Sequence, residues 1–272
     1  MSESNSEGPR ISAASVPARD GYDWVRLSIR LFRLQWLRYC ALAALFTLIS
    51  QITGALTGGL LAFFLKPILS VGFLAAAWHH ERGETPEVKH LFAGFRSNVG
   101  ALLPLGLFYL FGLLIAVTVA AYASGMDLRL LMEAQTAQTP PTIDRETLAQ
   151  FMMFTMLAML PINAALWFAP ALIVFADAGP FSALKESFVA WTRNIFAVIV
   201  FSIAFFGVIL IAVLVVAPLL LIFGGALQNV IVMIAVVPVI AIYMISDYVS
   251  YRRVFHRTER LAANENRQTP PG

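Results

Sequence analysis

The chain has few charged residues and a single cysteine for its length. Only 13% of its 272 residues are charged, whereas soluble domains carry about a quarter. Cys40 stands alone, which excludes an intrachain disulfide and a paired thiol site. This composition excludes an ordinary soluble enzyme, a disordered regulator and a disulfide-stabilised secreted domain.

The sequence also lacks the short motifs that carry common chemistry. It has no GxxxxGK[ST] phosphate loop, no GxSxG nucleophile elbow, no GxGxxG turn and no HExxH zinc motif. Apart from charges that flank apolar segments, no basic and aromatic pattern typical of nucleic-acid binding is present. We therefore expect no enzymatic activity, no cofactor, no metal and no nucleic-acid partner.

Hydrophobic residues make up 59% of the chain and are gathered in long runs. A helix that crosses roughly 30 Å of hydrocarbon needs about 20 apolar residues, and six runs reach or approach that length. The runs are continuous rather than alternating, which disfavours a β-barrel. The sequence predicts an all-α, polytopic transmembrane bundle with spans at Leu37–Ile52, Leu60–Trp78, Val99–Tyr122, Leu148–Phe175, Ile195–Phe223 and Val230–Ser250.

The basic residues lie almost entirely on one side of these spans. Sixteen of the nineteen Lys and Arg residues fall in the N-terminal segment, in the loops after the second and fourth spans, or in the C-terminal tail. Arg129 and Arg145 lie on the other side, and Lys66 lies within the second span. The positive-inside rule then predicts that both termini are cytoplasmic.

A pattern recurs before the first, third and fifth spans. An aliphatic, a bulky and an aromatic residue follow the spacing i, i+4, i+7, which places them on one helix face. Two spans follow each copy, so the sequence predicts three parallel pseudo-repeats, each introduced by a cytoplasmic amphipathic helix. Chance recurrence of apolar patterns is the alternative. The copies are Val25-Ile29-Phe32, Val88-Phe92-Phe95 and Leu184-Phe188-Trp191.

These patterns predict one membrane domain over residues 20–256, flanked by disordered cytoplasmic tails at 1–19 and 257–272. Its outer loop, residues 123–147, is interpreted as a spacer with a short surface helix at Met126–Ala137, and a functional loop is the alternative. The three repeat units are predicted at 20–80, 86–178 and 180–256.

Three polar residues in the spans are candidates for a site. Lys66 lies about seven residues into its span, roughly 10 Å deep, so its charge must face a polar cavity, a helix interior or a partner, or else snorkel outward. Asn163 is expected to tie helices together or to satisfy a carbonyl freed by a proline kink, with a substrate contact as the alternative. Asp247 is expected at a different depth from Lys66, near the cytoplasmic end of the last span and capped by Arg252 or Arg253.

Basic and aromatic residues beside the spans are candidates for the lipid interface. Lys and Arg keep their charges in water while their stems lie along apolar surface, and aromatic rings anchor the boundary. We expect these residues to contact lipid headgroups or a docking partner, with a plain topological anchor as the alternative. They are Arg26, Arg30, Arg33, Lys89, Lys185 and Trp191.

One loop is rich in imidazole, with His79-His80-Glu81 followed by His90. Imidazole and carboxylate are suitable metal ligands, but adjacent histidines rarely reach one ion together. We therefore interpret this segment as a hydrated interfacial loop, and a metal site is the alternative.

Three apolar segments, Gly72–Trp78, Leu91–Asn98 and Phe168–Asn194, carry a resemblance to known proteins. Through them the chain resembles an uncharacterised family of proteobacterial six-helix inner-membrane proteins. More remotely, it is similar to the membrane domain attached to some glycerophosphodiester phosphodiesterases. The resemblance implies a bacterial inner membrane and adds no catalytic residue, because the soluble phosphodiesterase domain is absent here.

The function that these features favour is that of a non-enzymatic accessory or scaffold protein, which binds membrane lipids or partner proteins through its cytoplasmic helices. The alternative is a small transporter or channel with a polar path between the repeats. A polar cavity shared by Lys66 and Asn163 would favour transport, whereas a close-packed centre would favour the scaffold. The sequence indicates neither a specific ligand nor an oligomeric state.

Overall fold

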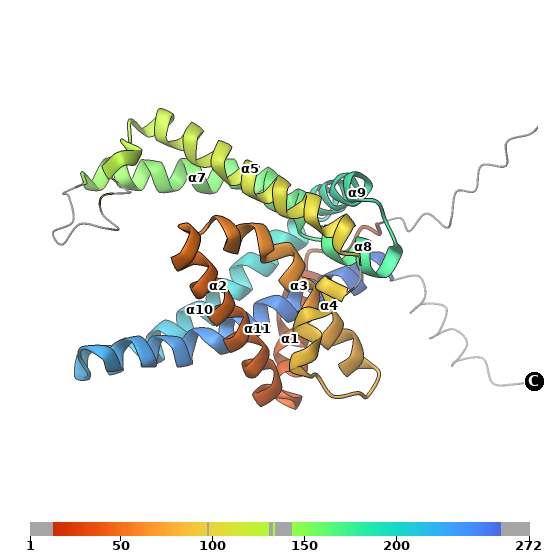
Figure 1. Ribbon diagram of the computed structural model, residues 1–272. Helices are drawn as coiled ribbons and strands as arrows, with labels where there is room; N and C mark the ends of the chain where they lie inside the picture. Colours follow the sequence, from red (N-terminus) through yellow and green to blue (C-terminus); the bar gives the residue numbers. More distant parts are fainter. Residues whose placement is uncertain (1–12, 97, 131–132, 134–142, 257–272) are drawn as a thin grey trace, which may run out of the picture.

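The computed structural model describes residues 13–96, 98–130, 133 and 143–256 (Figure 1). Every regular element in these ranges is a helix, and six helical segments are long and apolar enough to cross a membrane. This confirms the predicted all-α bundle with six spans. The spanning helices are α2 (Trp36–Thr57), α3 (Leu60–Glu81), α5 (Val99–Ser124), α7 (Arg145–Leu166) continued by α8 (Ala169–Ala176), α10 (Ile195–Ile222) and α11 (Ala226–Phe255).

The spans form three hairpins, α2–α3, α5–α7 and α10–α11. The first turns tightly at Gly58 and Gly59, whose φ values of 60° and 93° lie in the left-handed region that glycine tolerates. Figure 1 shows the hairpins diverging toward their turns, with α5–α7 standing apart from α10–α11. We call this side of the molecule the hairpin end.

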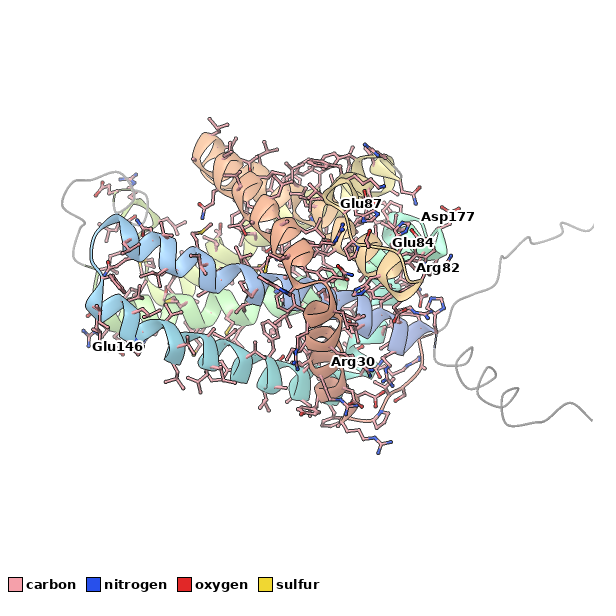
Figure 2. The ribbon with its side chains drawn as sticks, turned by 90° about the horizontal axis from the view of Figure 1, so that it is seen from below. Arg30, Arg82, Glu84, Glu87, Glu146 and Asp177 are labelled. Carbon is pink, nitrogen blue, oxygen red and sulfur yellow. The ribbon has the colours of Figure 1, made fainter. Side chains whose placement is uncertain are left out.

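Short helices and charged loops gather at the opposite side, which we call the charged end. Each hairpin is preceded there by a short element, namely α1 (Asp20–Leu34), the 3-10 helix η1 (Val88–Phe92) with α4 (Ala93–Arg96), and α9 (Pro180–Arg193). The repeat relationship among these three units, with a common axis, stays a prediction. Figure 2 shows the polarity of the molecule, with Glu146 at the hairpin end and a group at the charged end that comprises Arg82, Glu84, Glu87 and Asp177.

Helix α1 is part of the packed core. Trp24 and Ser28 are fully buried, and α1 packs across both α10 and α11. A Cβ atom at Gly21 would lie 1.9 Å from the carbonyl oxygen of Ala197 on α10, so the two backbones are in direct contact. The face predicted to lie on the membrane surface therefore packs on protein, and the opposite face carries the exposed arginines.

The second copy of the repeat does not form the predicted continuous α-helix. It is a 3-10 helix followed by four α-helical residues, and its Val88, Phe92 and Phe95 side chains are exposed rather than packed. Leu91 is fully buried instead, and Gly94 fits so closely that an added Cβ would lie 2.3 Å from the carbonyl oxygen of Ile68. Close packing against α3 therefore decides which residues of this segment are buried, and the predicted i, i+4, i+7 spacing does not.

The fourth span is interrupted where the sequence predicts a continuous run. Helix α7 ends at Leu166, and α8 begins at Ala169 with Pro170 in its first turn. The buried Ser187 hydroxyl on α9 accepts a hydrogen bond from the Phe168 N–H and donates one to the Ala164 carbonyl, both at 2.9 Å. One side chain thus satisfies two backbone groups that the break leaves without helical partners.

The prediction of a disordered N-terminal tail is wrong for residues 13–19, because part of this segment is hydrogen-bonded to the charged end. The Asn194 side chain accepts a hydrogen bond from the Val16 N–H at 2.7 Å and donates one to the Ala14 carbonyl at 3.0 Å. Backbone groups of an extended segment need such partners when they are buried. Residues 1–12, residues 257–272 and half of the predicted surface helix at 126–137 lie outside the described residues.

Candidate functional site: the Lys66 cavity

A half-open cavity of about 430 Å³ lies between the three hairpins. Its volume falls in the range of small-molecule sites, and its wall combines apolar residues with several polar groups. We call it the Lys66 cavity. Its polar and aromatic lining comprises Lys66 and Ser70 of α3, Tyr109 of α5, Asn163 of α7, Trp167, Trp191 of α9, Ser202 of α10, and Tyr243 and Asp247 of α11.

Lys66 is held in the wall by one aromatic neighbour. Its Nζ donates a hydrogen bond to the Tyr109 hydroxyl at 3.2 Å and lies 4.8 Å from the centre of the same ring. Within the described ranges, no carboxylate lies within ion-pair distance of Lys66. An ammonium group has three donors, so Lys66 keeps donors for a ligand in the cavity.

The structure corrects the expectation for Asp247. This residue lines the Lys66 cavity, on the same wall as Tyr243 of α11. Arg252 pairs instead with Glu81, at 3.3 Å. Lys66 is the seventh residue of the 22-residue α3 and Asp247 is the twenty-second of the 30-residue α11, and the cavity reaches both.

Asn163 reaches the cavity as an exposed residue of α7. The expectation that its side chain caps a carbonyl freed at a kink finds no such hydrogen bond in the described part of the chain. The helix continues past Pro161 and ends only at Leu166. Asn163 and Lys66 therefore line one cavity.

Trp191 lies in the cavity wall rather than at the lipid interface where the sequence placed it. Helix α9 packs against α7 and places Trp191 in the cavity wall, whereas Phe181 and Phe188 of the same helix are exposed. The Trp191 Nε1 is buried and has no acceptor among the residues that the structure describes. By contrast, the indole of Trp167 donates to the Ser250 hydroxyl at 3.1 Å. Trp191 thus supplies a second unused donor to the cavity wall.

A second cavity of about 360 Å³ adjoins the first and shares Lys66, Tyr243 and Met244 with it. Ser50 is its other polar side chain. The two cavities therefore meet at Lys66, and the second is largely apolar whereas the first has several polar residues in its wall. The remaining lining is Phe46, Ala62, Phe63, Phe205, Val239 and Ile240.

Sequence reasoning did not single out several of the cavity residues, among them Tyr243 and Tyr109. Tyr243 precedes Asp247 by four positions, a spacing that places both on one face of α11 and could have revealed it. Tyr109 carries no comparable signal, because it meets Lys66 from another hairpin, 43 positions along the chain.

The remaining candidates for the lipid interface are exposed at the charged end. Two of them also pair with nearby carboxylates: Arg26 lies 2.9 Å from Asp23, and Lys89 lies 2.9 Å from Glu87. Their contact with lipid stays a prediction. The exposed residues are Arg26, Arg30, Arg33, Lys89 and Lys185.

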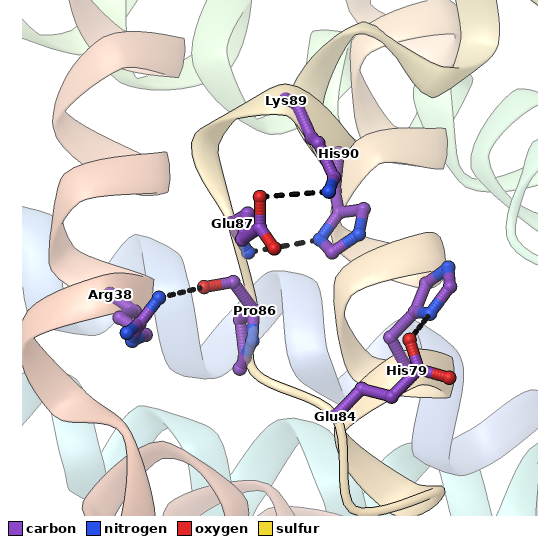
Figure 3. Close-up of polar contacts among 7 residues, drawn as sticks. All are labelled: Arg38, His79, Glu84, Pro86, Glu87, Lys89 and His90. Atoms are coloured by element: carbon purple, nitrogen blue, oxygen red, sulfur yellow. Dashed lines mark hydrogen bonds and ion pairs between the residues drawn. The ribbon is translucent and has the colours of Figure 1, made fainter.

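The histidine-rich loop is held by contacts within itself (Figure 3). His79 Nδ1 lies 2.5 Å from a Glu84 carboxylate oxygen, and the Glu87 N–H donates to His90 Nδ1 at 3.0 Å. Burial lowers the pKa of His90, and the hydrogen bond from Lys89 lowers the pKa of Glu87. No group of three or more metal-ligating side chains exists in the described ranges, so the metal alternative finds no support.

The chain is similar to a probable inner membrane protein of Burkholderia thailandensis. The two are 28% identical over 249 residues, which span 88% of this chain and 92% of that protein. No known protein family matches the chain, and no solved structure matches it. The relative and the six apolar helices together identify an integral membrane protein of the inner membrane. The remote similarity to phosphodiesterase membrane domains and the side on which the termini lie stay predictions.

Proposed function

We propose that this protein binds a single-chain amphiphile in the Lys66 cavity and moves it within or across the membrane. The observation that carries the proposal is the convergence of Lys66, Asn163 and Asp247 on one half-open cavity. A scaffold that acts only through its surface helices has no need of a polar chamber between its spans. Charged groups inside a membrane are costly, and they typically mark a ligand or ion pathway.

The charges of the cavity suit a zwitterionic head group. Lys66 offers a cation and Asp247 a carboxyl group, so the phosphate of one ligand would meet an opposite charge and its ammonium a hydrogen-bond acceptor. Asn163 and the unused indole N–H of Trp191 add neutral donors.

The apolar cavity next to Lys66 suits the tail of the same ligand. Phe63 of α3 and Phe205 of α10 both line it. Each methylene group buried there contributes about 0.8 kcal/mol. The volumes of 430 and 360 Å³ match a head group and part of one chain better than two complete acyl chains.

The packing of the helices supports entry from the side. Helix α7 packs on α5, α8 and α9, whereas α10 packs on α1, α9 and α11. The Lys66 cavity occupies the space between these two groups, and Leu160 on α7 is 44% exposed at its edge. A ligand leaving the bilayer would therefore enter between α7 and α10.

The test is equilibrium binding of fluorescent lysophosphatidylethanolamine to the full-length chain in nanodiscs. Lys66→Gln removes the charge but keeps a donor, and we expect the affinity to fall about tenfold or more, as for a lost charge-assisted hydrogen bond. The matched control is Lys185→Gln, the same change on the exposed face of α9, which should leave the affinity unchanged. Equal affinities for Lys66→Gln and the parent protein would contradict the proposal.

A further inference from the structure

A separate pocket of about 260 Å³ lies at the charged end, between α1, the last residue of α3 and the last turns of α11. It shares no lining residue with the Lys66 cavity. Leucines of α1 form one wall and arginines another, so the pocket is amphipathic. Its lining is Leu27, Arg30, Leu31, Leu34, Glu81, Val249, Arg252 and Arg253.

Helical spacing brings these residues together. The α1 residues follow the pattern i, i+3, i+4, i+7, and the α11 residues follow i, i+3, i+4, so each helix presents a single face to the pocket. Arg30 is exposed on α1, and Figure 2 shows it at the surface of the molecule. Of the three arginines of α1 predicted at the lipid interface, Arg26, Arg30 and Arg33, only Arg30 lines the pocket.

The arginines of this pocket carry more positive charge than the carboxylates among the described residues neutralise. Arg252 pairs with Glu81 at 3.3 Å, and the same carboxylate oxygen accepts a hydrogen bond from the Tyr248 hydroxyl at 2.7 Å. In the part of the chain that the structure describes, Arg30 and Arg253 have no carboxylate partner. The Arg253 Nε is buried and has no acceptor there. A buried guanidinium donor without an acceptor is unfavourable, and an anion would relieve it.

We infer that this pocket binds the headgroup phosphate of one anionic phospholipid from the leaflet beside the charged end. The phosphate would accept hydrogen bonds from Arg30 and from Arg253 Nε, because guanidinium groups suit the planar, bidentate recognition of phosphate. The first methylenes of the lipid would lie along Leu27, Leu31 and Leu34, and Leu34 is 64% exposed at the edge. This apolar wall favours a lipid over free phosphate.

The net charge of the pocket selects an anionic lipid over a zwitterionic one. Three arginines face one glutamate, which leaves two positive charges. Phosphatidylglycerol brings one uncompensated negative charge, whereas the ammonium of phosphatidylethanolamine would add another cation beside Arg30. The site is therefore distinct in ligand class as well as in position from the cavity proposed to take a zwitterion.

The experiment is native mass spectrometry of the full-length chain in detergent, titrated with phosphatidylglycerol, with phosphatidylethanolamine of the same chains, and with inorganic phosphate. We expect one phosphatidylglycerol to bind more tightly than either other probe. Arg30→Gln should weaken it about tenfold, and Arg253→Lys, which keeps the charge but removes Nε, should weaken it as well. The matched control Arg33→Gln, an exposed arginine of the same helix, should change the affinity less than twofold.

Three outcomes would overturn the inference. Equal binding of the two lipids would show no selection for negative charge, and inorganic phosphate binding as tightly as phosphatidylglycerol would assign the site to a free anion. Equal losses in Arg30→Gln and Arg33→Gln would indicate diffuse surface attraction. Lys66→Gln should leave phosphatidylglycerol binding unchanged, so failure here is distinguishable from failure of the cavity proposal. Retained monomer mass and circular dichroism verify that each variant is folded.

Discussion

The ammonium of Lys66 donates a hydrogen bond to the hydroxyl of Tyr109, 3.2 Å away, and so joins α3 to α5 at the cavity wall. Tyr109→Phe keeps the ring near Lys66 but removes this acceptor. We expect the free energy of unfolding to fall by about 0.5–1.5 kcal/mol, as for one ordinary hydrogen bond. Reversible unfolding in mild detergent measures the change. Tyr122→Phe is the control, since Tyr122 is 92% exposed on the same helix, and equal losses in the two variants would contradict the stabilising role of the contact.

The contact of α1 with α10 depends on Gly21. Gly21→Ala places a Cβ 1.9 Å from the Ala197 carbonyl oxygen, and neither backbone has room to yield. We expect a loss of about 1–3 kcal/mol or more, the range for overpacking a core. Gly54→Ala on α2 is the matched control, because an added Cβ there meets no atom within 4 Å. Thermal unfolding of both variants checks this, and an unchanged midpoint in Gly21→Ala would contradict the described contact.

Ser187 stabilises the break between α7 and α8. Ser187→Ala leaves the Phe168 N–H and the Ala164 carbonyl without their buried partner. We expect a loss of about 1–3 kcal/mol, because unsatisfied buried groups retain their full desolvation cost. Ser182→Ala changes an exposed serine of the same helix and should be close to neutral. Denaturant unfolding followed by tryptophan fluorescence measures both, and similar midpoints would show that the hydroxyl is dispensable.

His90 gives the charged end a pH-dependent stability. Burial and the neighbouring His79 and Lys89 lower the pKa of His90 in the folded state, while Glu87 and Glu84 oppose them. Its stabilising contribution is present above the ordinary histidine pKa of about 6.5 and is lost as the pH falls through that value toward the folded pKa. We therefore expect the unfolding temperature to fall between about pH 7.5 and about pH 5.5. His90→Gln should flatten this slope, and a slope as steep as that of the parent protein would assign it to other groups.

The spans were predictable because the length of an apolar run decides whether a segment crosses a bilayer. The second and third spans begin at Leu60 and Val99 in both the sequence prediction and the structure. The break at the end of α7 could not be predicted, because Ser187, which stabilises it, lies 19 positions further along the chain. The hydrophobic pattern around the break contains no information about a hydrogen-bond partner so far along the chain.

The sequence identified several residues of the candidate site, but it did not predict that they line one cavity. Polar groups inside apolar runs identified Lys66, Asn163 and Asp247 as unusual. Their convergence depends on how the three hairpins pack around one cavity, which residue counting within a single span cannot supply. Trp191 was misplaced for a related reason, since the packing of α9 on α7 decides which side of the surface helix faces inward.

The most direct test of the central claim is photo-crosslinking of a lysophosphatidylethanolamine that carries a diazirine near its head group, to the full-length chain in nanodiscs. Peptide mass spectrometry would locate the label. The account predicts labelling of the α10 and α11 segments around Ser202 and Tyr243, suppressed by unlabelled ligand and reduced in Lys66→Gln. Labelling confined to outward-facing residues such as Leu221, which is 89% exposed, and unaffected by Lys66→Gln, would contradict it.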